Sequence, residues 1–238
     1  MRTGVFVQVR LGSTRLPGKA LLPLAGATVI QHVMRALIGV PADVHALLTD
    51  EASEAVLRPF AHREGFELLR GPDEDVLERY CLACRAYDVQ RVVRATGDNP
   101  LTCPRMAVAI MEVHARTGAD LSHYLRLPWG SGVEVVESAA LFRAEREAQR
   151  QDERENLTTY LYRHPETFTI QEPIAPESAD CVDARVTVDT PDDYEAVKSI
   201  FQELYIGFPI EAERIVAWYR LRGMGECSPE AGRGSVYA

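Results

Sequence analysis

The chain has 238 residues, of which 46% are hydrophobic and 26% charged, and its formal net charge is −9. This length suits one large α/β domain or two small ones, and the composition is that of a soluble globular protein. The acidic balance argues against a general nucleic-acid binder, which would carry a basic face. No stretch approaches the ~18–20 apolar residues that span a bilayer. The start of the chain is too short, and too polar after Val9, for a secretory signal, which predicts a cytoplasmic protein.

The first half of the chain alternates strand and helix patterns. Valine-rich apolar runs predict strands at 3–9, 44–49, 66–71 and 91–97. Helical spacing predicts helices from about Thr28, over 53–65, over 72–87, and from Pro104 to about Thr117. In the helix over 53–65, Ser53 is the expected N-cap and Gly65 follows the expected end. The alternation predicts an α/β fold with a mostly parallel sheet, helices on both faces, and ligands at the carboxyl ends of the strands.

The second half is less regular. Residues 121–138 carry Pro and Gly breaks before a short strand pattern, and 141–164 read as a helix broken into two or three pieces. Strands are predicted at 168–173 and 184–190, and helices from Pro191 and over 211–221. The Gly-rich residues 223–238 lack periodicity and predict a flexible tail.

The cysteines predict free thiols. Five are present, an odd number in a chain without an export signal. Cys81 and Cys84 form a C-x-x-C, but it lies well inside a helical pattern, whereas a redox pair sits at a helix N-terminus. A zinc site would need a second such pair, which the sequence lacks. We therefore expect these two residues to be small buried hydrophobes.

The stretch 8–20, QVRLGSTRLPGKA, carries the first candidate site. It is not a P-loop, because five residues instead of four separate Gly12 from Gly18, and Lys19 is followed by Ala20 and not by Ser or Thr. Backbone N–H groups of a turning Gly-Ser-Thr segment can still face an anion, and Arg10, Arg15 and Lys19 supply positive charge. The alternative is a surface loop with solvated charges.

Two acids follow predicted strands. Asp98 comes after the strand at 91–97, and Asp189 comes near the end of the valine-rich run before Pro191. Magnesium is typically bound by one or two carboxylates together with substrate phosphates, so the pair predicts a metal site. The alternatives are an Asx turn before Pro100 for Asp98 and a helix N-cap for Asp189.

The run VQVRLGSTRLPGKALLPLAGATVIQHVMRAL resembles the signature of the sugar cytidylyltransferases. It is most similar to the spore coat polysaccharide biosynthesis group and, beyond it, to the enzymes that make CMP-Kdo and CMP-sialic acid. Weaker elements follow in the family's order: GPDEDVLERY, RATGDNPL, WGSGVEVVE, ERENLTTYLYRHPE and RVTVDTPDDYE. The resemblance implies one Rossmann-like nucleotidyltransferase domain over 1–222. Its irregular, β-containing insertion at 119–183 is a candidate for dimerisation and sugar binding.

The same resemblance implies a chemistry. Arg15, Lys19 and Asp98 would act in catalysis, and Asp98 and Asp189 would hold Mg²⁺ while a sugar hydroxyl attacks the α-phosphate and pyrophosphate leaves. Such chemistry needs positioning and electrostatics more than a nucleophilic side chain. The residues implied to bind the triphosphate of CTP are Arg10, Leu11, Gly12, Ser13, Thr14, Arg15 and Lys19. The implied partners are CTP, a small sugar acid or related sugar, and a second copy of the chain, with a role in surface polysaccharide biosynthesis and neither nucleic acid nor membrane.

The acceptor side is less defined. The candidate sugar-binding residues are His123, Tyr124, Trp129, Glu134 and Arg163, each with ordinary packing or a solvated loop as its alternative. Relatives usually have Glu-His-Val where this chain has Glu155–Asn156–Leu157, and often an acid where Cys103 stands, so both differences concern the acceptor. Residues 124–129 also supply apolar side chains for a homodimer interface: Tyr124, Leu125, Leu127 and Trp129.

Two other functions stay open. One is a nucleotide- or sugar-binding regulator that has lost turnover, against which the presence of Lys19, Asp98 and Asp189 argues. The other is a glycosyltransferase that uses a nucleotide-sugar donor, a class that usually relies on an Asp-x-Asp metal motif. One fold hosts many activities, so the fold alone cannot separate these functions.

Overall fold

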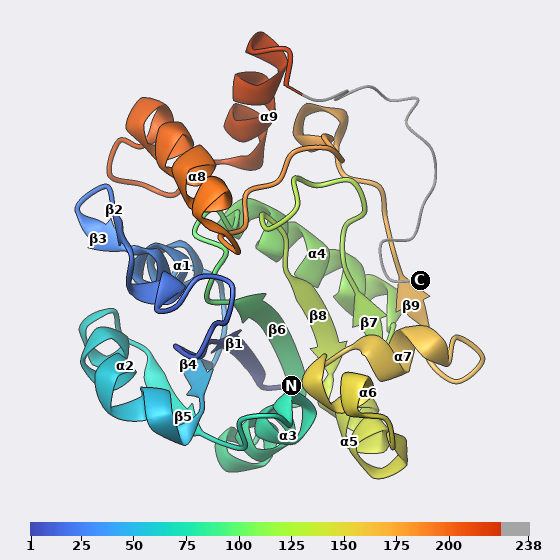
Figure 1. Ribbon diagram of the computed structural model, residues 1–238. Coiled ribbons are helices and arrows are strands. Elements are labelled where there is room, and N and C mark those ends of the chain that lie inside the picture. The colour runs from blue at the N-terminus through green and yellow to red at the C-terminus, as the bar shows by residue number, and fades with distance from the viewer. Residues whose placement is uncertain (225–238) are drawn as a thin grey trace.

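The computed structural model describes residues 1–224, and a seven-stranded sheet is its centre (Figure 1). The strand order is β5-β4-β1-β6-β8-β7-β9. Four neighbours are parallel, namely β5 (Glu67–Arg70), β4 (Val44–Thr49), β1 (Thr3–Gln8) and β6 (Arg91–Thr96). β8 (Glu134–Glu137) is antiparallel to β6 and to β7 (Leu121–Ser122), and β9 (Ile170–Gln171) pairs in parallel with β7. The predicted mostly parallel α/β sheet is therefore confirmed.

Helices cover both faces of this sheet. They are α1 (Val29–Leu37), α2 (Glu51–Arg63), α3 (Val76–Tyr87), α4 (Pro104–Thr117), α5 (Ser138–Glu147), α6 (Gln151–Glu155), α7 (Thr159–Arg163), α8 (Pro191–Leu204) and α9 (Ala212–Leu221). The small hairpin of β2 (Pro23–Leu24) and β3 (Ala27–Thr28) stands apart from the main sheet. The irregular helical stretch of the insertion is thus three short helices, α5 to α7, as its pattern predicted.

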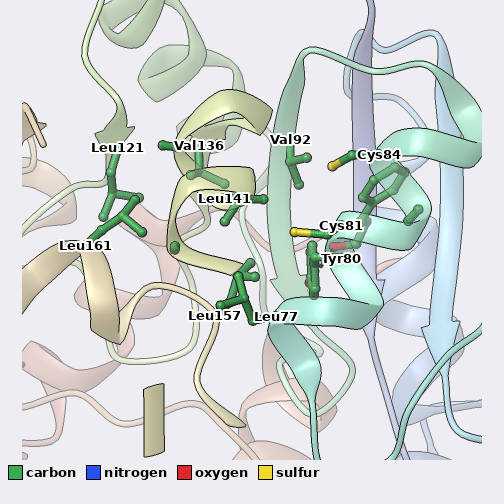
Figure 2. Packing of buried hydrophobic residues seen from close by; sticks show 14 of the residues in the cluster. Leu77, Tyr80, Cys81, Cys84, Val92, Leu121, Val136, Leu141, Leu157 and Leu161 are labelled. Carbon is green, nitrogen blue, oxygen red and sulfur yellow. Dashed lines mark hydrogen bonds between the residues drawn. The ribbon is translucent and has the colours of Figure 1, made fainter. Parts of the chain in front are cut away.

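Alternation along the strands divides the core into two layers. Val5 and Val7 of β1 pack with α1, α2 and α4, whereas Phe6 between them faces the opposite layer with α3 and α5. Successive side chains of a strand point to opposite faces, so a strand of this kind is apolar throughout. Figure 2 shows the second layer, in which Leu77 and Tyr80 of α3 lie beside Val92 and other buried side chains.

The C-x-x-C pair belongs to this layer (Figure 2). Cys81 and Cys84 are buried free thiols, and burial raises the pKa of both, that of Cys84 to about 11. A thiol with a raised pKa is a poor nucleophile, so packing is the role that fits. Cys103 is also a buried free thiol, but Cys181 is disulfide-bonded, so the prediction of free thiols is wrong for that residue.

Two local predictions differ from the structure. Asp50, and not Ser53, is the N-cap of α2: its Oδ1 accepts a hydrogen bond from the Ser53 N–H at 2.6 Å. The predicted strand at 184–190 is an extended segment with one isolated bridge, between Trp129 and Arg185. This segment forms only occasional backbone hydrogen bonds to neighbouring segments. Its alternating valines therefore reflect burial in the core and not a regular strand.

The predicted flexible tail at 223–238 falls almost wholly on 225–238, which lie outside the described residues. Within residues 1–224, no helix combines the length and apolar character needed to cross a membrane.

Two histidines, buried His32 and half-buried His45, should make stability depend on pH. His32 Nε2 lies 2.7 Å from the Leu24 carbonyl oxygen, and its ring packs on Phe201 and Tyr205. Burial lowers the pKa of His32 and also that of His45. The unfolded chain therefore binds more protons below a pH of about 6.5, and stability falls as the pH drops through that value.

We expect the melting temperature to fall as the pH is lowered from about 7.5 to about 5.5, with part of the loss carried by His32. His32→Gln retains a donor for Leu24 and removes the titration, so its melting temperature should fall less steeply. His62→Gln, at an exposed position, is the control. Equal slopes for wild type and His32→Gln in differential scanning calorimetry would contradict this assignment.

Candidate functional site

The site is built on the loop that follows β1. β1 is central among the parallel strands, so its carboxyl end lies between those of β4 and β6. The Leu11 N–H donates to Ser53 Oγ at 2.9 Å, and the Gly18 N–H donates to the Leu11 carbonyl at 3.2 Å. Gly18 has a φ of 67°, a left-handed conformation that glycine adopts without strain. These contacts close the loop and direct the chain into Lys19.

Lys19 joins the two predicted acids. Its Nζ lies 2.5 Å from Asp98 Oδ2 and 2.8 Å from Asp189 Oδ1, and its side chain is only 12% exposed. Arg15 Nη2 lies 2.9 Å from the same Asp189 oxygen, and Arg185 Nη2 lies 2.6 Å from the other. Residues 19, 98 and 189 therefore meet at one point, as their positions after predicted strands indicated.

Backbone contacts fix the position of Asp189. The Val186 N–H donates to the Trp129 carbonyl and the Val188 N–H to the Asp98 carbonyl, each at 2.8 Å. Val186 and Val188 are fully buried against α8 and α9. The next residue, Thr190, is the N-cap of α8 and accepts from the Asp193 N–H. The N-cap role considered for Asp189 is thus filled by its neighbour, and its carboxylate is available to the site.

A cavity of about 610 Å³ opens beside this loop, within the size range of small-molecule sites. The predicted residues that line it are Arg10, Ser13, Thr14, Arg15, Lys19, Asp98, Asp189, His123, Tyr124, Trp129 and Glu134. Leu11, Gly12 and Arg163 are not among its lining residues. Arg163 is ion-paired with Asp152 and Glu153 and does not line this cavity. A second, more open hollow of about 550 Å³ over 162–172 contains none of the loop residues.

Basic side chains gather in the cavity although the chain as a whole is acidic. They are Arg10, Arg15, Lys19, Arg79, Arg94 and Arg126, facing the acids Asp73, Asp98, Glu134, Glu155 and Asp189. The local cations offset the field of a chain with a net charge of −9. An anionic ligand is therefore compatible with this cavity.

Another part of the cavity wall holds a buried polar network. Glu134 is 5% exposed, accepts from Arg94 Nη1 at 2.8 Å, and also accepts from the hydroxyls of Thr158 and Tyr162 at 3.1 and 3.0 Å. His123 Nε2 lies 2.9 Å from Glu172 Oε1. The candidates His123 and Glu134 are thus held in fixed orientations at the cavity wall.

Sequence reasoning missed several lining residues. Arg94 had a signal, because a charge inside the apolar run RVVRAT needs a reason to be there. Arg126 has a φ of 69°, unusual for a residue other than glycine, and its Nε lies 2.7 Å from Asp180 Oδ2. Neither this strain nor the burial of Arg79 leaves a motif in the sequence.

The two acids fit a hard divalent cation. Each presents a carboxylate oxygen to the same ammonium nitrogen, beside the loop that follows β1. No group of three or more His, Cys, Asp or Glu side chains suited to a metal occurs among residues 1–224. Magnesium in phosphate chemistry needs only one or two carboxylates, because phosphates and water complete its shell.

A parallel sheet with a basic loop at its strand ends, beside two acids, is an arrangement suited to binding the phosphates of a nucleotide. The family model for cytidylyltransferases matches residues 5–217. The chain therefore belongs to the cytidylyltransferase family and is a nucleotidyltransferase, which confirms the resemblance in its sequence.

Individual relatives agree. The chain is 32% identical over 205 residues to the spore coat polysaccharide biosynthesis protein SpsF of Bacillus subtilis, covering 83% of this chain and 85% of SpsF. A cytidylyltransferase structure from Leptospira borgpetersenii superposes with a TM-score of 0.87 at 23% identity, covering 99% and 100% of the two chains. CMP:2-keto-3-deoxy-manno-octonic acid synthetase complexed with CTP superposes with a TM-score of 0.67 at 16% identity, covering 85% and 99%. Both structures show the same fold.

Mg²⁺ and the Lys19 ammonium should compete for the same carboxylates. Lys19→Met removes the cation that Asp98 and Asp189 share and, among residues 1–224, leaves only Asp189 paired, with Arg15 and Arg185. We therefore expect a lower melting temperature that millimolar MgCl₂ raises more than it does in wild type. Lys198→Met, which removes an exposed lysine of α8 beside Glu195, is the control. The same MgCl₂ response in all three proteins would exclude a metal at these acids.

Proposed function

We propose that this enzyme transfers CMP from CTP to a sugar acid or a related sugar, with Mg²⁺ and release of pyrophosphate, in the synthesis of a surface polysaccharide. The observation that carries the proposal is the meeting of Lys19, Asp98 and Asp189 at one edge of the cavity. The similarity to SpsF supports the polysaccharide role, and the fold shared with a CTP-bound synthetase supports the nucleotide.

The loop would bind the triphosphate. Arg10 and Arg15 are more than half exposed and can turn from Asp73 and Asp189 to phosphate oxygens at little cost. Ser13 and Thr14 line the same side and offer hydroxyl donors, whereas the Leu11 N–H is used by Ser53 and neither Leu11 nor Gly12 lines the cavity. The loop is anchored at Ser53, so these donors are held in place before the ligand arrives.

Lys19 would act at the transferring phosphate. The sugar hydroxyl oxygen forms a bond to the α-phosphorus as the bond to the pyrophosphate oxygen breaks, and negative charge builds on the phosphoryl oxygens. Lys19 supplies a preorganised positive charge there, supported by Arg15. Asp98 and Asp189 would hold Mg²⁺, which when bound neutralises charge on the phosphates.

The acceptor would occupy the opposite wall. His123, Tyr124, Trp129 and Glu134 line it, and the Glu134 carboxylate can accept a hydrogen bond from a sugar hydroxyl. Asn156, at the position where relatives have His, also lines the cavity, whereas Cys103 is buried and its Sγ contacts Glu211. Of the two differences from relatives, only Asn156 is therefore placed to affect the acceptor directly.

The structure weakens the glycosyltransferase alternative. The chain contains one Asp-x-Asp triplet, Asp73–Glu74–Asp75. Asp75 accepts from the Glu78 N–H as the N-cap of α3, and Asp73 is paired with Arg10. One acid of the triplet thus serves as a helix cap, whereas Asp98 and Asp189 share one cation, Lys19, which favours them as the metal-binding acids.

Asp98→Asn and Asp189→Asn should each reduce turnover by about two orders of magnitude or more, because each removes a charge that positions the metal. Folding should survive, since the side-chain shape is kept. Turnover is measured as pyrophosphate release with CTP, MgCl₂ and a panel of acidic and amino sugars, and folding is measured by calorimetry. Asp192→Asn, at an exposed position of α8, is the matched control. Near-normal turnover in either test variant removes that acid from the site.

We also propose a homodimer formed through 119–183. The residues expected at the interface, Tyr124, Leu125, Leu127 and Trp129, all line the cavity, but Ile174 beside them is 62% exposed. Ile174→Asp should therefore shift a dimer toward monomer in light scattering at micromolar concentration, with turnover per active site unchanged unless the partner completes the cavity. Ile206→Asp, an exposed position between α8 and α9, is the control. A monomeric wild type refutes the dimer.

A further inference from the structure

Arg79 is a buried cation without an acid partner. It lies on the first turns of α3 and is 2% exposed. Its Nε donates to the Pro72 carbonyl at 3.0 Å, and its Nη2 donates to the Pro72 and Asp73 carbonyls, the latter at 2.9 Å. The nearest carboxylates are engaged elsewhere, Asp73 with Arg10 and Asp50 with the N–H of Ser53. Within residues 1–224, no salt bridge to Arg79 is formed.

One part of this guanidinium has no protein partner. The two carbonyls use Nε and Nη2, so both N–H groups of Nη1 are without a hydrogen-bond acceptor among the described residues. Arg79 lines the cavity proposed to bind the nucleotide. Nη1 is not among the atoms of residues 1–224 that are both sealed from solvent and unpaired, so it stays accessible and can donate to an acceptor that a ligand in the cavity supplies.

The position of Arg79 differs from that of Lys19, Asp98 and Asp189, although Asp73, whose carbonyl it bonds, also pairs with Arg10 of the loop. The Arg79 Cγ would lie 2.7 Å from a Cβ on Gly71, directly after β5. Lys19, Asp98 and Asp189 meet at the other side, beyond β1 and β6. In Figure 1, α3 and α8 lie on opposite sides of β1, with the loop between them. A nucleotide whose phosphates lie at Lys19 would extend its base toward α3.

We propose that Arg79 reads the base of the bound nucleotide, its Nη1 donating to the ring carbonyl oxygen O2 of a pyrimidine. The inference rests on the proposed function, because it needs a pyrimidine nucleotide in this cavity. The bonds to the Pro72 and Asp73 carbonyls fix the plane of the guanidinium, and Val76 one turn earlier on α3 gives the same wall an apolar surface. A fixed donor suits a planar, directional acceptor better than a mobile phosphate.

Binding of CTP and of tripolyphosphate, which has no base, separates the two contacts. In titration calorimetry with MgCl₂, Arg79→Met should weaken CTP about tenfold or more and leave tripolyphosphate unchanged, as loss of a charge-assisted hydrogen bond predicts. Arg79→Lys retains a charge that can bond one carbonyl, and it should show the same selective loss if Arg79→Met does not fold.

Arg154→Met is the matched control. Arg154 also anchors the turn before α3, through Asp75 at 2.6 Å and the Glu145 carbonyl at 2.8 Å, but it does not line the cavity. It should alter the melting temperature without changing the ratio of the CTP and tripolyphosphate affinities.

Equal weakening of CTP and tripolyphosphate by Arg79→Met would overturn the proposal in favour of a phosphate contact, and no weakening of either would leave Arg79 as support for the turn only. A wild type that binds tripolyphosphate but not CTP also overturns it. Selective, Arg79-dependent binding of CTP in a protein that releases no pyrophosphate with any sugar would instead uphold the base contact and refute the proposed function.

Discussion

The ammonium group of Lys19 joins parts of the chain that are far apart in sequence. It holds Asp98, which follows β6, and Asp189, which follows the extended segment before α8. Two carboxylates this close would repel each other at low dielectric, so the cation between them is a condition for the folded arrangement. The loop after β1 places this cation, so the arrangement of the two acids depends on the conformation of the loop.

The neighbouring packing meets this condition. β1 and β6 are adjacent and parallel, so the ends that carry the loop and Asp98 lie at the same edge of the sheet. The Val188 N–H bond to the Asp98 carbonyl then fixes residue 189 beside residue 98, and the buried side chains of Val186 and Val188 hold that segment against α8 and α9. Packing of the apolar core thus sets the distance between the carboxylates of Asp98 and Asp189, which would otherwise repel each other.

Much of this could be read from the sequence, because it depends on periodicity and order. Valine-rich runs separated by helical patterns predict parallel strands, and residues directly after such strands share an edge, which is why Asp98 and Asp189 could be paired in advance. The segment before Asp189 was harder: its alternating valines are buried, but its backbone bonds go to the irregular residues 98 and 129 and not to a regular strand. The predicted N-cap of α2 is three residues too late, because Asp50 and Ser53 are both good capping residues. In the structure the Ser53 hydroxyl instead accepts a hydrogen bond from the Leu11 N–H, and Asp50 caps the helix.

Side-chain networks across distant segments were beyond prediction. Arg163 and Glu134 carry equal weight in the sequence, yet one pairs with Asp152 and Glu153 outside the cavity and the other is buried at its wall. The distinction follows from where α6 and α7 pack, which no local pattern encodes. Arg79 illustrates the same limit, since arginine is common in helices and only its burial sets it apart.

The ion pairs of the cavity also differ in how readily a ligand could exchange them. Arg10 with Asp73, and Arg15 with Asp189, involve arginine side chains more than half exposed to solvent, so phosphate oxygens can replace these carboxylates with little loss. In the pair of Arg94 and Glu134, the side chains are only 18% and 6% exposed. Glu134 also accepts hydrogen bonds from two further donors, Thr158 and Tyr162. Displacing Glu134 would leave a buried carboxylate without its strongest partner, which costs far more. Under the proposed function, the exposed pairs would lie where the triphosphate binds, and the buried pair would keep the shape of the wall that faces the acceptor.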